Sequence, residues 1–148
     1  MRIVKSSAAE GEWFKYETQD STPEDTAEFK IRRIPSEARK RVVKGRFHEK
    51  EKVTIRKGAV ELDRESERVR LADIDLAAFA LVDARTATVP ASIVGQGGNE
   101  DFVLDGRLSD EIKRCLLDEL PDLRAFVLEM SDSLEAKRLQ KEAELGEA

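Results

Sequence analysis

The stretch from Ser66 to Arg85, SERVRLADIDLAAFALVDAR, limits most strongly what this chain can fold into. Its apolar residues recur at the three- and four-residue spacing of an α-helix, at Leu71, Ile74, Ala78, Leu81 and Val82. Leu76 and Phe79 extend this apolar surface around the helix, so only a narrow strip is left for water. The pattern predicts a helix of about five turns. Such a helix lies in the centre of the core or in a contact between protomers, and we favour the core.

Two segments near the N-terminus, EWFKYET and AEFKIRRI, flank the turn-rich stretch QDSTPEDT. They predict an antiparallel hairpin with a long polar loop. Placing Tyr16 opposite Phe29 puts Phe14 opposite Ile31, so one register gives two apolar cross-strand pairs. Trp13 then points to the other face, where a helix or a partner chain could cover it.

A second hairpin is predicted for VTIRKGAVEL, Val53 to Leu62. With Lys57-Gly58 as a two-residue turn, Ile55 faces Val60. Lys-Gly is a weaker turn signal than Asn-Gly, and a helix through this charged region is the alternative.

Between the two hairpins the sequence IPSEARKRVVKG predicts a short helix. Ser36 can cap its N-terminus and Gly45 can end it. We expect Ala38, Val42 and Val43 to face inward, with the basic residues in solvent.

The segment TATVPASIVGQGGNED, residues 86–101, breaks the helical spacing with one proline and three glycines, and it predicts a loop. DFVLDG then predicts a short extended piece. Ser109 is the expected N-cap of the next helix, and Pro121 is expected to start the last one. The last helix carries an apolar stripe at helical spacing, which makes an antiparallel helix pair plausible: Leu123, Phe126, Val127, Met130 and Leu134.

These elements predict an α+β fold with small N-terminal antiparallel hairpins and a helical C-terminal half. Residues 1–134 are expected to form a single domain, because a chain of 148 residues can bury a real core. Residues 135–148 are highly charged, and we expect a tail that is a frayed helical end or is ordered by a partner. The sequence contains no apolar run long enough for a bilayer or a signal peptide, so we expect no membrane contact and a cytoplasmic location.

The formal net charge of −5 hides a strong asymmetry. Residues 30–57 hold twelve basic and three acidic residues, so this block carries +9 and the rest of the chain −14. The block could dock an acidic partner, or the chain's own acidic segments could cover it. A nucleic-acid-associated factor that uses this block is the alternative function. It is disfavoured because no known nucleic-acid-binding motif accompanies the charges.

Residues typical of catalysis or metal binding are scarce. His48 is the only histidine and Cys115 the only cysteine, so no zinc site of His and Cys ligands can form within one chain. Cys115 lies among apolar residues and is expected to serve packing. GQGGNED lacks the Gly-Lys-Ser/Thr ending of a phosphate loop, and we predict no cofactor and no enzymatic activity.

Three stretches in this order carry a family resemblance: GEWFKYE with EFKIRRIPSEARKRV, then AAFALVDAR, then LDGRLSDEIKRCLLDELPDLRAFVLEMSDSL. Over residues 11–134 the chain resembles the tail assembly chaperone type of accessory protein from tailed bacteriophages and prophages. The resemblance implies a non-enzymatic protein that holds a helical tail protein, the tape measure, or a tail tube protein, during virion assembly in the host cytoplasm.

Such a role needs amphipathic helices with apolar surface that a partner can cover. The expected partner-binding residues are Leu116, Leu117, Leu120, Leu123, Phe126, Val127 and Met130. Leu76 and Phe79 are second candidates, and plain core is the competing interpretation for all of them. Self-association through the same helices is also expected, because several linked contacts suit a long helical client.

Overall fold

The structure is a computed structural model that describes residues 11–18, 26–47, 59–95 and 100–146. Within these residues it contains four strands and four α-helices, which confirms the predicted α+β class. In chain order the elements are β1 (Glu12–Tyr16), β2 (Ala27–Ile31), α2 (Ser36–Phe47), α3 (Ala59–Ala80), β3 (Leu81–Pro90), a 3₁₀ helix (Ala91–Val94), β4 (Asp101–Arg107), α4 (Asp110–Glu119) and α5 (Pro121–Gly146).

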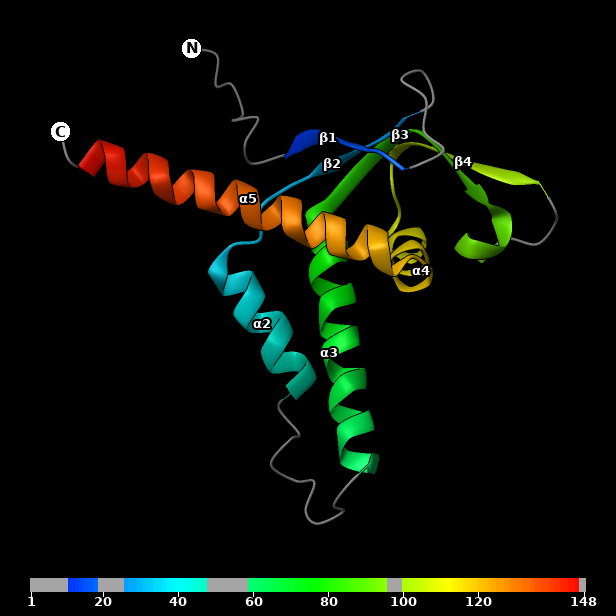
Figure 1. Ribbon diagram of the computed structural model, residues 1–148, viewed down its shortest axis with the longest axis horizontal. Coiled ribbons are helices and arrows are strands. Elements are labelled where there is room, and N and C mark those ends of the chain that lie inside the picture. Colours follow the sequence, from blue (N-terminus) through cyan, green and yellow to red (C-terminus); the bar gives the residue numbers. More distant parts are fainter. Residues whose placement is uncertain (1–10, 19–25, 48–58, 96–99, 147–148) are drawn as a thin grey trace.

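The strands form one antiparallel sheet in the order β1-β2-β3-β4. The helices lie on one side of this sheet, below it in Figure 1. α3 leads away from the sheet with α2 beside it, and α5 crosses α3 close to the strands (Figure 1). The core fills the space between the strands and α3, α4 and α5. Its largest fully buried apolar side chains are Ile31, Leu81, Leu104, Leu116, Leu117, Leu123 and Val127.

The first hairpin is confirmed, but its register differs from the predicted one by two residues. Phe14 lies opposite Phe29, and Tyr16 lies opposite Ala27. A shift of two residues preserves the pleat, so the same side chains still face inward. Tyr16 packs with its ring centroid 5.0 Å from that of Phe126 in α5, a long-range contact that local pairing could not reveal.

Gly11 marks the start of β1 for a steric reason. Its φ is +103°, and a Cβ at this position would lie 2.5 Å from the carbonyl oxygen of Ile31. The backbone at residue 11 therefore approaches β2 more closely than a residue with a Cβ atom would allow. On the outer face, the guanidinium of Arg85 lies 4.0 Å from the ring centroid of Trp13. Within the described chain, a side chain of β3, two strands away in the sheet, thus covers part of this indole.

The second predicted hairpin is wrong where the structure can be compared. Residues 59–62, expected as a strand, are the first turn of α3, and residues 53–58 lie outside the described residues. Alanine, leucine and glutamate, which dominate this turn, are strong helix formers. A helix through this charged region, the alternative interpretation, is therefore correct for residues 59–62.

The long central helix is confirmed only as far as Ala80. β3 begins directly at Leu81 without a connecting loop, so the predicted helix is wrong for residues 81–85 and the predicted loop is wrong for residues 86–94. Leu81 is completely buried, but as a strand residue between β2 and β4. A short apolar run fits both periodicities, so only its tertiary neighbours could decide between them.

The C-terminal end of α3 is stabilised by cations from outside the helix. The backbone N–H of Arg32 donates to the Ala80 carbonyl (2.8 Å), and its Nε donates to the Phe79 carbonyl (2.7 Å). Lys113 Nζ donates to the Ala78 carbonyl (3.4 Å) from α4, and burial lowers the pKa of this amine. α3 has no basic residue in its own last turn. The two cations therefore satisfy its last carbonyls and complement the negative end of its dipole.

α4 and α5 begin where the sequence predicts. The Ser109 hydroxyl accepts a hydrogen bond from the Ile112 N–H (3.3 Å), and Pro121 is the first residue of α5. The predicted antiparallel pairing is wrong: α4 is seen nearly end-on in Figure 1, whereas α5 lies across the picture. α5 continues without a break to Gly146, so residue 134 is not the end of a helix.

α2 also runs further than predicted. It passes through Gly45 to Phe47. Ala38 and Val42 are half-buried against the core, but Val43 is 41% exposed, so the inward orientation is wrong for Val43. Within the described chain, no helix is both long and apolar enough to span a bilayer.

We predict that Arg32→Met lowers the free energy of unfolding by about 2 kcal/mol, because it removes a charge-assisted hydrogen bond to the end of α3. Arg39→Met is the matched control, since Arg39 makes only an exposed ion pair with Asp132, worth less than about 1 kcal/mol. Urea denaturation of the two variants measures the difference. Equal losses would contradict the capping role of Arg32.

Candidate functional site

A bulge in β3 gives the sheet its most irregular feature. Ala84 pairs with Gly106 and Ala87 with Leu104, so two residues of β3 stand where β4 has one. One of the two, Thr86, has a φ of +55°. This left-handed conformation is rare for a β-branched residue, and strained residues of this kind cluster at functional sites. The bulge also increases the local twist, so the sheet bends away from β1 and β2 at this point.

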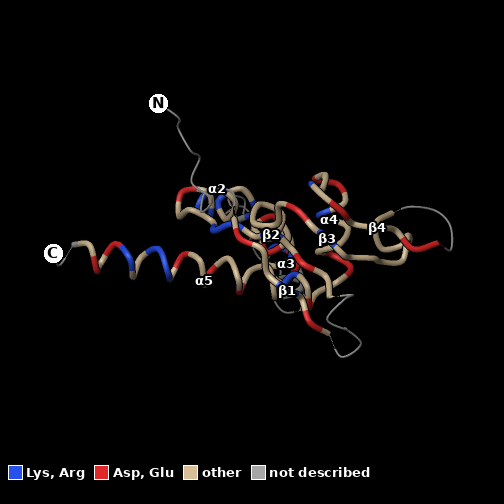
Figure 2. The backbone as a smooth tube through the Cα atoms, turned by 90° about the horizontal axis from the view of Figure 1, so that it is seen from above, with Lys and Arg blue, Asp and Glu red and all other residues tan. Residues whose placement is uncertain are grey.

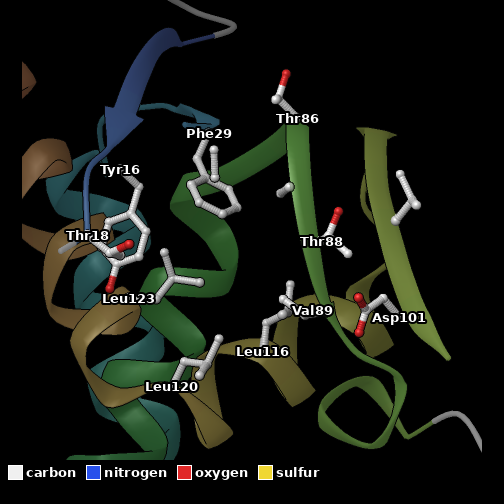
Figure 3. A pocket seen from close by; sticks show the side chains of 13 residues that line it. Tyr16, Thr18, Phe29, Thr86, Thr88, Val89, Asp101, Leu116, Leu120 and Leu123 are labelled. Carbon is white, nitrogen blue, oxygen red and sulfur yellow. The ribbon is translucent and has the colours of Figure 1, made fainter. Parts of the chain in front are cut away.

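A cleft of about 560 Å³ lies beside the bulge, between the sheet and the helices. In Figure 3, Tyr16 and Phe29 lie on one side, Thr88 and Asp101 lie on the other, and the leucines of α4 and α5 form the base. Its lining residues come from all four strands and both C-terminal helices: Tyr16, Thr18, Ala27, Phe29, Thr86, Ala87, Thr88, Val89, Asp101, Val103, Leu116, Leu120 and Leu123.

The lining surface is about half apolar and half polar, and its side chains carry a few hydroxyl groups and a single carboxylate, that of Asp101. No basic residue contributes to it. Burial raises the pKa of the Tyr16 hydroxyl, and the negative charge of Asp122 raises this pKa further. The hydroxyl is therefore protonated at neutral pH and can donate a hydrogen bond. The cleft is thus suited to an apolar group that carries or adjoins a positive charge.

The structure divides the predicted partner-binding residues into two groups. Leu116, Leu120 and Leu123 line the cleft, although only Leu120 is appreciably exposed. Leu116, Leu117 and Val127 have no exposed surface and Leu123 is 2% exposed, so in this conformation these four residues belong to the core, and of the three cleft leucines only Leu120 is within reach of a partner. A leucine or valine in the core contributes to stability through its burial instead.

The other predicted residues contact the edges of the core. Phe126 is half-buried against Tyr16, and Met130 is half-buried against the core cluster. Of the second candidates, Leu76 is buried, and the ring of Phe79 is covered by the Arg32 guanidinium at 4.0 Å. Core packing, the competing interpretation, therefore accounts for Leu76, Leu117 and Val127.

Sequence reasoning missed the strand side of the cleft. Thr86, Thr88 and Val89 were expected in a loop, and Asp101 at its end. The signal available was the β-branched content of TATV, which is typical of a strand. Pro90 masked this signal, but it lies at the last position of β3 opposite Asp101, where a missing N–H is tolerated.

Three arginines of the basic block are paired with acidic side chains of the same chain. Arg33 pairs with Glu135 (3.2 Å), Arg39 pairs with Asp132 (2.9 Å), and Arg46 pairs with Asp75 (2.6 Å). Figure 2 shows the basic residues of α2 gathered on that helix, with acidic residues on its neighbours. The expectation that acidic segments cover the block therefore holds for these three arginines. Lys40, Arg41 and Lys44 stay exposed on α2, and nucleic-acid binding remains an untested alternative.

Asp75 joins three helices. Its carboxylate accepts hydrogen bonds from Arg46 of α2 and Arg114 of α4, while Asp75 itself belongs to α3. Its side chain is only 14% exposed. Burial by itself would raise the pKa of Asp75, but the two guanidinium groups outweigh burial and hold this pKa below its ordinary value.

Other candidate ligands do not assemble into a site. His48 lies outside the described residues, as do positions 96–99 of the glycine-rich loop. Cys115 is half-buried on α4, with its Sγ 3.9 Å from where a Cβ on Gly95 would lie, which fits its expected packing role. Among the described residues, no group of three or more His, Cys, Asp or Glu side chains is arranged to hold a metal ion.

Comparisons with protein families, with curated proteins and with solved structures find no match to this chain. The role of the cleft therefore has to be inferred from its own geometry and chemistry.

We predict that Asp75→Asn lowers the free energy of unfolding at pH 7 by about 2 kcal/mol, because it weakens the three charge-assisted hydrogen bonds that Arg46 and Arg114 donate to this carboxylate. The folded-state pKa of Asp75 is depressed, so this stabilisation exists above the unfolded pKa of about 3.9 and is lost as the pH falls through the folded value. The gap between the two proteins should therefore close in acid. Asp118→Asn, which removes an exposed partner of Arg70, should cost less than about 1 kcal/mol. Urea denaturation from pH 7 to pH 3 measures both differences, and a gap that stays constant would contradict the assignment.

We predict that Thr86→Gly stabilises the protein by roughly 0.5–1 kcal/mol. Glycine removes the strain of the left-handed backbone, and the greater conformational entropy that glycine loses on folding offsets only part of this gain. Thr88→Gly, two residues along the same strand, has no positive φ to relieve and should lose about 1 kcal/mol. Thermal unfolding measures both shifts. A lower melting temperature for Thr86→Gly would show that the bulge is not strained.

Proposed function

We propose that this chain is a non-enzymatic assembly chaperone of the phage tail type, which binds a helical segment of a tail protein in the cleft beside the β3 bulge. The observation that supports the proposal is the cleft itself. It is concave and partly apolar, and its base contains Leu116, Leu120 and Leu123, which the resemblance marks as partner-binding and of which Leu120 is appreciably exposed. The cleft falls within the roughly 300–1,000 Å³ that is usual for binding pockets.

An amphipathic helix is the partner shape that suits this cleft. Such a helix places one or two apolar side chains into a groove and leaves its polar face in water. Leu120 and Val89, which are both partly exposed in the lining, offer apolar contact, and the hydroxyl groups of Tyr16 and Thr88 can bond to polar atoms at the rim. The client then needs no deep opening of the core, because the buried Leu117 and Val127 remain in place.

Charge narrows the choice of client segment. Asp101 lines the cleft, and Asp122 is near enough to raise the pKa of Tyr16. These two carboxylates favour a segment whose apolar residues are flanked by lysine or arginine. A long helical tape-measure protein offers many such segments, and holding them would keep its apolar stripes from aggregating. The host cytoplasm, where tails assemble, is the proposed site of action.

The test is co-expression with the tape-measure protein encoded by the same phage or prophage. We expect the chain to raise the soluble fraction of that protein and to co-elute with it on gel filtration. Thr88→Lys should abolish both effects, because it places a long cation in the cleft and repels a basic client. Ser92→Lys is the matched control: Ser92 is exposed and outside the cleft lining, so the same added charge should leave binding intact.

Two results would count against the proposal. The first is that the wild-type chain forms no complex with either the tape-measure or the tail tube protein. The second is that Thr88→Lys binds as well as Ser92→Lys, in which case the client uses another surface.

A further inference from the structure

β4 is an edge strand of the described sheet, and its backbone polar groups are arranged for a further strand. Ala91 N–H donates to the Glu100 carbonyl (3.3 Å), and Leu108 N–H donates to the Val82 carbonyl (3.3 Å). In an antiparallel sheet, residues that bond to one neighbouring strand alternate with residues that face the other side. Counting residues along β4 from either of these two hydrogen bonds assigns the same residues to the free edge. The residues of β4 whose N–H and C=O groups turn to the free edge are Asp101, Val103, Asp105 and Arg107.

This edge is uncovered within the described chain, although three of its four outward-facing residues are charged. Within the described chain no strand pairs with its free side, and Figure 2 shows β4 at the periphery of the molecule, at the opposite end from α5. Val103 is 65% exposed, among the highest values for a large apolar residue in the described chain. Proteins usually cover or charge such edges, since an open one is a template for another strand.

The charges along β4 select a partner. We propose that a second copy of this chain pairs with it, β4 against β4, in the antiparallel register centred on Leu104. In this register Asp101 of each copy lies opposite Arg107 of the other, so two cross-strand ion pairs form by symmetry. All four outward-facing residues of each strand then have a bonding partner.

The competing register, centred on Val103, is electrostatically less favourable. It places Asp101 opposite Asp105 of the other copy at two positions, and like charges directly opposite each other are destabilising.

The remaining positions agree with the register centred on Leu104. Phe102 lies opposite Gly106 of the other copy, and an aromatic ring across from a glycine covers backbone that glycine leaves bare. Leu104 lies opposite its own symmetry mate, and Val103 gains a diagonal contact with the Val103 of the second copy.

Pairing of this kind has a geometric consequence. A two-fold axis perpendicular to the sheet keeps the same face of both copies on the same side. Because Asp101 and Val103 of β4 also line the cleft, the two clefts would open on one face of a continuous sheet, on either side of the β4 pair. The pairing rests on β4 alone and does not depend on what the cleft binds.

Analytical ultracentrifugation of the full chain over a range of concentrations tests the inference. We expect the wild-type protein to show a concentration-dependent dimer. Val103→Pro should raise the dimer dissociation constant by about tenfold or more, since it removes an outward N–H at the centre of the edge. The N–H of Val103 does not face β3, so the variant should keep the fold of the protomer. The control is Val69→Thr, a substitution at another exposed valine, and this variant should dimerise normally. A proline at position 69 would not serve, because it would break α3.

A charge exchange keeps the test decisive if the proline variant unfolds. Asp101→Arg alone sets like charges opposite Arg107 and should weaken the dimer about tenfold. The double variant Asp101→Arg with Arg107→Asp restores opposite charges and should return the dissociation constant to within about threefold of wild type. In the register centred on Val103, Asp101→Arg would instead strengthen the dimer. A wild-type monomer at every concentration, or a dimer that neither the proline nor the charge variants weaken, would overturn the proposal.

Discussion

The end of α3 is the point on which the arrangement of the protein depends. This helix passes into β3 with no loop, so its last carbonyls meet the beginning of a strand in the interior. Helix ends buried without partners are costly, because each unpaired carbonyl loses its bond to water. Arg32 and Lys113 supply the partners from two other elements. The Ser131 hydroxyl donates to the Arg32 carbonyl (3.0 Å), which ties α5 to the same junction.

The site follows from this junction. Because α3 stops at Ala80, residues 81–90 are free to form the third strand and to bring β4 beside it. The bulge at Arg85 and Thr86 then bends this part of the sheet, and α4 and α5 supply the leucines beneath it. The cleft is therefore a product of long-range contacts: each of its walls comes from a different region of the chain, and no local motif contains it.

This dependence explains which features the sequence alone could predict. The cap at Ser109, the start of α5 at Pro121 and the first hairpin rest on local chemistry, and these predictions are confirmed. The helix that was expected to continue to Arg85 ends at Ala80. The sequence did not indicate this end, because the residue that caps the helix, Arg32, is distant in sequence and looked like one charge in a solvated block. The same holds for the site: three leucines were found from their helical spacing, whereas the strand residues opposite them lay in a segment that reads as a loop.

The charged residues on the helical side of the molecule differ in their pairing from those on the sheet side. On the helical side, arginines of α2 and of the β2–α2 connection are paired with Asp75, Asp132 and Glu135, so they hold α3 and α5 in place. Cations that form pairs within the protein are less available to bind phosphates, and the affinity for nucleic acid depends on the number of available cations. On the sheet side, Asp101 lines a partly apolar cleft with no cation in the lining. The negative charge of the cleft and the three internal pairs of the basic block therefore lie on different parts of the molecule, and the charge pattern of the sequence as a whole does not reveal the sign of the charge in the cleft.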